Sequence, residues 1–78
     1  AGGEAVDEDL FERLRALRRQ IAEKAGVPPY VVFHDSALVE MAALKPMSLD
    51  ALRGVKGVGE RKLERYGAAF LEVIAGGS

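Results

Sequence analysis

One glycine-rich stretch carries residue types that could bind a phosphate. It reads GVKGVGERK over residues 54–62. Gly57 and Gly59 permit positive φ and a close approach of the backbone to a ligand. Free backbone amides at the start of the helix that follows attract an anion. Three basic side chains would surround that anion, those of Lys56, Arg61 and Lys62. The same glycines and valines could equally form a structural turn that binds nothing.

A second set of candidate binding residues begins with Tyr30. Pro28 and Pro29 precede it and could hold its ring at the surface, where stacking on a nucleobase contributes about 1–3 kcal/mol. The ring could instead pack against the core with its hydroxyl in water. Arginines on one flank of a helix expected over 8–25 are further candidates, namely Arg15, Arg18 and Arg19, while Arg13 and Lys24 occupy the other flank. Either flank could lie near Tyr30.

The charges are distributed unevenly along the chain, whose net charge is −1 at pH 7. The first twelve residues hold five acidic side chains and no basic one: Glu4, Asp7, Glu8, Asp9 and Glu12. All 11 basic residues follow, against seven acidic ones. Such segments are ordinarily solvated helix faces with local ion pairs. A DNA-binding module is expected to be basic overall, so the acidic start also suggests a surface that meets another protein.

Residues suited to catalysis or to metal binding are sparse. His34 is the sole histidine and cysteine is absent, which excludes disulfides and thiolate chemistry. Asp35 and Ser36 adjoin His34 but fit better as helix caps than as catalytic partners. The stretch at 54–59 lacks the GK[ST] ending of a P-loop. We therefore expect no catalytic residue, no metal site and no cofactor in this chain.

The elements that position these residues are predicted to be helices. Apolar residues such as Leu10, Leu14 and Leu17 recur at steps of three or four, and this spacing predicts helices over 8–25, 36–44, 49–53 and 60–75. The expected N-caps are Asp7, Asp35 or Ser36, and Ser48. Residues 30–33 could pass for a strand, but with no second strand to pair with we expect 28–33 to be an extended or turn-like connector, buried against the helices. Together these elements predict an all-α, compact orthogonal bundle.

Several boundaries and contacts follow from the same pattern. We expect a linker or tail over 1–7, the helical domain over 8–76 and a tail over 77–78. Leu49 and Leu52 should face inward, and Gly67 within the last helix indicates close approach of a neighbouring helix. The apolar runs fall far short of the roughly 20 residues that a membrane helix needs. We expect a soluble, cytoplasmic, monomeric module.

The turn at 54–59 resembles the helix-hairpin-helix motif, in which a glycine–apolar–glycine turn gives backbone amides to a DNA phosphate. Two positions depart from that motif. Lys56 stands where the motif often has proline, and Glu60 puts a carboxylate where the phosphate would lie.

Two longer segments are similar to a known domain. They read LFERLRALRRQIAEKAGVPPYVVFHDSALVEMA and LRGVKGVGERKLERYGAAFLEVI. Over residues 10–75 they resemble the HRDC domain, which is named after RecQ-type helicases and RNase D, and VPPYVVF is more similar to the bacterial RecQ form. The resemblance implies five helices, no cofactor and weak binding of single-stranded or branched DNA. It also implies that the tyrosine after the double proline, Tyr30 here, takes part in binding single strands.

Two hypotheses follow. In the first, the chain is a non-catalytic accessory module of a RecQ-type, ATP-dependent DNA helicase at the nucleoid, and it modulates how the helicase engages DNA. Its DNA contacts would be Tyr30, Arg15, Arg18, Arg19, Lys56, Arg61 and Lys62. In the second, it is an inter-domain or protein–protein regulatory module with little DNA binding, and its acidic surface comprises Asp7, Glu8, Asp9 and Glu12. A positive surface around Tyr30 favours the first hypothesis, and a neutral or negative one the second.

Overall fold

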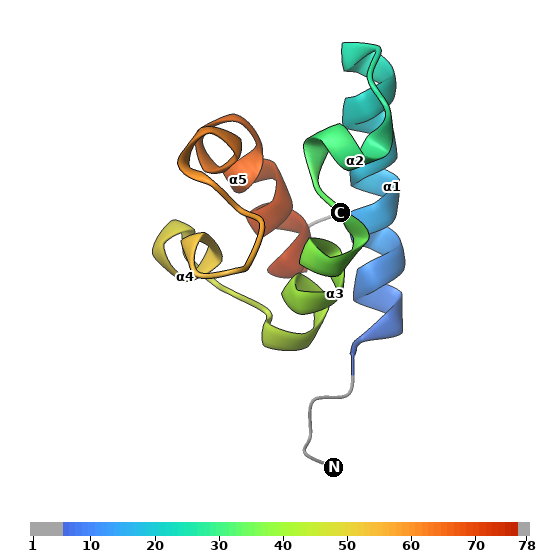
Figure 1. Ribbon diagram of the computed structural model, residues 1–78. Helices are drawn as coiled ribbons and strands as arrows, with labels where there is room; N and C mark the ends of the chain where they lie inside the picture. Colours follow the sequence, from blue (N-terminus) through green and yellow to red (C-terminus); the bar gives the residue numbers. More distant parts are fainter. Residues whose placement is uncertain (1–5, 77–78) are drawn as a thin grey trace.

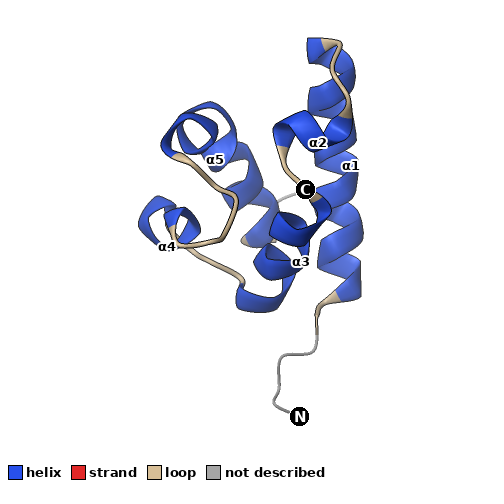
Figure 2. Ribbon diagram, viewed as in Figure 1, coloured by secondary structure: helices blue, strands red, loops and turns tan. Residues whose placement is uncertain are grey.

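Helices make up every regular element in the part of the chain that the structure describes, which is residues 6–76 of a computed structural model. Their order is α1 (Glu8–Ala25), α2 (Pro29–Val32), α3 (Asp35–Leu44), α4 (Leu49–Arg53) and α5 (Glu60–Ile74). No strand occurs among these residues (Figure 2), which confirms the all-α prediction. Most of the expected linker and the tail at 77–78 lie outside the described residues.

The helices form two groups that pack on each other (Figure 1). α2 and α3 lie against α1 on one side of the molecule, and α4 pairs with α5 on the other. α5 also reaches across to contact α1. None of the helices within residues 6–76 is both long enough and apolar enough to cross a membrane.

The ends of α1 follow the predicted capping residues. The Asp7 carboxylate accepts a hydrogen bond from the Leu10 amide at 3.0 Å, which satisfies one of the free donors at the helix start. Gly26 ends the helix in the left-handed conformation, with φ 71° and ψ 33°, where glycine carries no Cβ penalty. These signals are local, and the predicted bounds of 8–25 are confirmed.

The connector expected at 28–33, extended or turn-like, is instead the one-turn helix α2 over residues 29–32, so the prediction of no helix here is wrong. Pro28 is extended, with φ −64° and ψ 151°, as the residue before a proline should be. Pro29, however, occupies the first turn of the helix, where its missing N–H would have no partner in any case. The turn buries Val32 completely and delivers the buried Phe33 to the core.

The N-cap predicted for the next helix is also wrong. α3 begins at Asp35, so the capping position falls to His34, whose side chain makes no capping hydrogen bond. Asp35 instead lies in the first turn of α3, and its carboxylate pairs with Arg18 at 2.7 Å. The acidic group therefore still lies at the positive end of the helix while it links α3 to α1.

The core is centred on Phe33. Its ring meets the Phe70 ring edge-on, with 4.9 Å between centroids, and the Tyr66 ring at 5.9 Å. Other completely buried side chains surround these rings: Leu14, Val32, Leu38, Met41 and Leu52. Phe33 directly follows α2, so the short helix is anchored to α5 through the core.

Gly67 allows the close helix approach that the sequence predicted. A Cβ at this position would lie 2.8 Å from Leu49 Cδ2 and 3.2 Å from Leu63 Cδ1. Leu49 thus lies over α5, yet it remains 47% exposed. The expectation that Leu49 faces inward is therefore wrong, whereas Leu52 is completely buried as predicted.

Candidate nucleic-acid interface

Tyr30 projects from α2 with 59% of its surface exposed. A one-turn helix that starts at a proline and runs into a buried phenylalanine has little freedom to move, and Val32 and Phe33 hold it to the core. The Tyr30 ring is therefore not one of the buried side chains of the core. An exposed aromatic ring on a fixed backbone is suited to stacking on an unpaired base.

A basic pocket lies beside α2. It has a volume of about 430 Å³, and its lining comprises Pro29 of α2 together with Glu12, Arg15, Ala16, Arg18 and Arg19 of α1. The flank of α1 that carries Arg15 and Arg19 is thus the one near Tyr30. Arg15 pairs with Glu12 at 3.3 Å, whereas Arg19 makes no ion pair with any residue from 6 to 76.

Arg18 differs from its two neighbours, because it is only 8% exposed. Its Nη1 donates a hydrogen bond to the Phe33 carbonyl at 2.9 Å and lies 2.7 Å from Asp35 Oδ1. Two acceptors already engage this nitrogen, so Arg18 is a poor candidate for a direct DNA contact. It holds the junction between α2 and α3 against α1 instead.

Lys62 of α5 is the basic residue that lies over the Phe33 ring. Its Nζ lies 5.8 Å from the centroid of the Phe33 ring, so the lysine stem covers the residue that follows α2. The charges around α2 are those of Arg15, Arg18, Arg19 and Lys62 against Glu12 and Asp35. Since Arg15 and Arg18 pair with the two carboxylates, Arg19 and Lys62 are the basic groups of this set that make no ion pair with residues 6–76.

The glycine turn has the shape that its sequence predicts. Val55 and Val58 are buried, and Gly57 adopts φ 94°, a conformation that a side chain would strain. Gly59 does not need such freedom, because its φ is −85°. Gly59 is the N-cap of α5 and contributes no side-chain cap, so the first amides of α5 remain available to an anion.

Glu60, the first residue of α5, forms an ion pair with Arg53. Its carboxylate pairs with Arg53 Nε at 2.7 Å, which reduces the conflict between Glu60 and a phosphate. Lys56 and Arg61 are both exposed, but no described contact connects either residue with Tyr30. The structure therefore places Arg15 and Arg19 beside Pro29, the residue before Tyr30, and Lys62 over the Phe33 ring, and leaves the turn as a separate basic feature.

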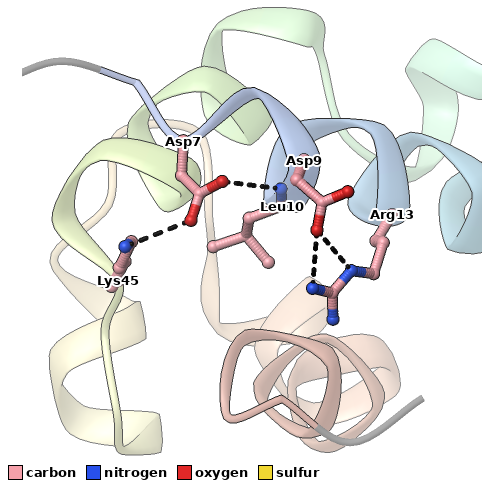
Figure 3. Close-up of polar contacts among 5 residues, drawn as sticks. All are labelled: Asp7, Asp9, Leu10, Arg13 and Lys45. Atoms are coloured by element: carbon pink, nitrogen blue, oxygen red, sulfur yellow. Dashed lines mark hydrogen bonds and ion pairs between the residues drawn. The ribbon is translucent and has the colours of Figure 1, made fainter.

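The acidic residues at the start of α1 are largely engaged within the domain (Figure 3). Asp7 caps α1 and pairs with Lys45 Nζ at 3.2 Å. Asp9 accepts two hydrogen bonds from Arg13, the shorter at 2.7 Å. Glu12 pairs with Arg15. Of the four residues of the predicted acidic surface, only Glu8 makes no ion pair with residues 6–76. Glu4, which belongs to the same acidic segment of the sequence, lies outside the described residues.

Two pKa values reflect these contacts. The hydrogen bond from the Leu10 amide, and after it that from Lys45, holds the pKa of the Asp7 carboxyl below its ordinary value of 3.8. The hydrogen bond to Asp9 and the charge of that carboxylate raise the pKa of Arg13. Both effects stabilise the charged forms of groups that pair with other residues of the domain at its surface. These carboxylates act as structural groups of α1.

Within residues 6–76, no three histidine or acidic side chains gather where they could hold a metal ion. His34 is exposed and lies beside Tyr30, with 5.9 Å between the ring centroids. No hydrogen bond joins it to a serine or a carboxylate in this part of the chain. Its surroundings are aromatic, and they offer no catalytic partner.

Known proteins share this sequence and fold. The family model for the HRDC domain matches residues 7–74. The ATP-dependent DNA helicase RecQ of Bacillus subtilis is 50% identical over 68 residues, which are 87% of this chain and 12% of that protein. RecQ of Haemophilus influenzae is 52% identical over 68 residues, again 87% of this chain and 11% of that protein. The chain thus spans only about a tenth of the length of these curated relatives.

A solved structure confirms the fold. The structure described as D. radiodurans RecQ HRDC domain 3 superposes with a TM-score of 0.85 at 39% sequence identity, and the match covers 88% of this chain and 91% of that one. The ATP-dependent DNA helicase UvrD2 of Mycobacterium tuberculosis is a further relative, 42% identical over 71 residues, which are 91% of this chain and 10% of that protein. The same domain therefore occurs in helicases with different names.

Proposed function

The chain belongs to the HRDC domain family, and from that premise we propose that it binds single-stranded or branched DNA weakly and modulates how a RecQ-type helicase engages its substrate. The observation that carries this proposal is an exposed tyrosine on a turn anchored to the core, whose first residue, Pro29, lines a basic pocket. The domain acts as a non-catalytic accessory of the helicase, at the chromosomal DNA of the cytoplasm.

Binding begins with an unpaired base that stacks on Tyr30. A base within a duplex already stacks on its neighbours, so the exposed ring favours strands whose bases are free. The adjacent pocket then takes the phosphate backbone, where Arg19 offers an unpaired guanidinium and Arg15 can turn from Glu12 to a phosphate. Lys62 extends this basic surface across the α2–α3 junction.

Affinity should be low, since few charges converge. Each phosphate that a cation neutralises on a single strand contributes a slope of about −0.7 to the dependence of log K on log salt. With Arg15, Arg19 and Lys62 as the main contacts, the slope should be about −2, so that binding weakens roughly 20-fold between 50 and 200 mM salt. Such a contact can modulate where a helicase engages DNA without holding it there.

The regulatory alternative has less support. It needs free carboxylates at the start of α1, but Asp7, Asp9 and Glu12 are engaged by Lys45, Arg13 and Arg15. A partner protein would have to replace these pairs. Contact with other domains of the helicase remains compatible with DNA binding, and neutralising Asp7, Glu8 and Asp9 in the full-length helicase tests it. Unaltered DNA affinity and unwinding would exclude it.

The direct test is titration of the 78-residue chain with a fluorescent single-stranded oligonucleotide at 50 and 200 mM salt. Tyr30→Ala should weaken binding by at least about fivefold, which corresponds to the lower end of the stacking energy. Arg19→Ala should lower the magnitude of the salt slope by about 0.7.

Val31→Ala is the matched control. Val31 neighbours Tyr30 on α2 and is 41% exposed, but it carries no ring. Its truncation should leave both the affinity and the slope unchanged. If the wild-type chain shows no binding at low salt, or if Tyr30→Ala binds like the Val31 control, the proposed DNA contact is wrong.

A further inference from the structure

A second ring lies beside Tyr30. The His34 imidazole is 5.9 Å from the Tyr30 ring between centroids, and the two planes are inclined by only 27°. Both residues are exposed. His34 occupies the N-cap position of α3, yet its side chain makes no capping hydrogen bond. The two rings are stacked on each other, and because both residues are exposed the imidazole lengthens the aromatic surface that Tyr30 presents.

The backbone on both sides of His34 is held by one buried side chain. Arg18 donates to the carbonyl of Phe33, which precedes His34, and pairs with the carboxylate of Asp35, which follows it. Phe33 is itself completely buried. The position of His34 is thus set before any ligand arrives, and a prearranged contact surface loses less conformational entropy on binding.

We propose that His34 and Tyr30 form one two-ring platform on which unpaired bases stack, so that His34 is a second base-contacting residue. This inference rests on the proposed function, because it presupposes that Tyr30 meets single-stranded DNA. Histidine rings stack on unpaired bases in the same manner as tyrosine rings. The basic pocket is lined by Pro29, the residue before Tyr30, and in this proposal it takes the phosphates of the stacked nucleotides.

His34→Ser is the informative variant. Serine is a favoured N-cap residue, so α3 keeps its start while the ring is lost. We expect its affinity for a single-stranded ten-nucleotide oligo(dA) to fall about five- to tenfold, with an unchanged salt slope. His34→Phe should restore most of the affinity. A fall of about 0.7 in the magnitude of the slope for His34→Ser would make His34 a phosphate ligand and overturn the stacking assignment.

Proton NMR distinguishes direct contact from mere support of the Tyr30 ring. His34 is the sole histidine of the chain, so its imidazole signals are assigned without further labelling. Stacked adenines should shift both carbon-bound imidazole proton signals as oligo(dA) is added. If Tyr30→Ala weakens binding but the imidazole signals stay fixed and His34→Ser binds like wild type, only this inference fails. If Tyr30→Ala has no effect, the proposed function itself fails.

Discussion

Arg18→Met tests how the α2–α3 junction is held. In the wild-type chain, Arg18 Nη1 donates to the Phe33 carbonyl at 2.9 Å and lies 2.7 Å from Asp35 Oδ1. Methionine keeps much of the apolar stem and removes both interactions. Because Phe33 is completely buried, its carbonyl cannot turn to water and would lose its partner in the variant.

The size of the effect follows from the surroundings of each group. An unpaired buried carbonyl costs about 1–3 kcal/mol. The Asp35 side chain is 76% exposed, so it regains water and its lost ion pair costs less than about 1 kcal/mol. Arg18 Nε is buried without a hydrogen-bond partner. Because methionine lacks this atom, the substitution removes an unfavourable buried group, which offsets part of the loss. We expect the free energy of unfolding to fall by about 2 kcal/mol, which lowers Tm by about 8–16 °C in a domain of this size.

Urea denaturation followed by circular dichroism at 222 nm measures this loss. Arg19→Met is the matched control, because Arg19 is the next residue on α1, is exposed and makes no ion pair with residues 6–76. Its free energy of unfolding should stay within about 0.5 kcal/mol of wild type. If Arg18→Met is as stable as this control, the junction is held by packing alone and the reasoning is refuted.

Three further predictions concern other parts of the domain. Gly67→Ala should leave the stability in urea nearly unchanged, because a gain in helix propensity of about 1 kcal/mol offsets the cost of displacing the half-exposed Leu49. Gly67→Val introduces a larger side chain and should unfold at a clearly lower urea concentration. Ionised Asp7 stabilises the folded state fully above pH 3.8, and this stabilisation is lost as the pH falls through its lower folded-state pKa. The difference in urea denaturation midpoint between Asp7→Asn and wild type should therefore shrink as a pH series descends below about 4. Lys62→Ala should reduce the magnitude of the salt slope for single-stranded DNA by about 0.7 without the loss of stacking expected for Tyr30→Ala, and an unchanged slope would remove Lys62 from the interface.

Most of the fold could be predicted because its signals are local. Caps such as Asp7 and Ser48 bond to amides three residues away, and Gly26 ends α1 through its own backbone conformation. The one-turn helix α2 was missed because a four-residue segment shows no apolar period. Its start at Pro29 was a usable signal, since proline favours the first turn of a helix.

The buried role of Arg18 could also have been noticed. The residues that α1 buries are Leu10, Leu14, Arg18 and Ala22, a strict four-residue spacing. The predicted spacing ran instead from Leu14 to Leu17, which is only partly buried. An arginine on a buried row signals a specific acceptor. Its acceptor is the carbonyl of Phe33, 15 residues later, and no local pattern encodes that contact. For the same reason, the proximity of Arg19 to α2 required the structure.

The net charge of −1 is a poor guide to what the Tyr30 surface attracts. Asp7 and Arg19 are twelve residues apart on the same helix axis, which corresponds to about 18 Å at 1.5 Å per residue. That distance exceeds twice the Debye length of about 8 Å at physiological salt, so Asp7 is largely screened from Arg19, whereas Glu12 lines the pocket itself and is paired there with Arg15. The carboxylates at the start of α1 are moreover neutralised locally by Lys45 and Arg13. An acidic end and a pocket lined by three arginines are therefore compatible within one helix.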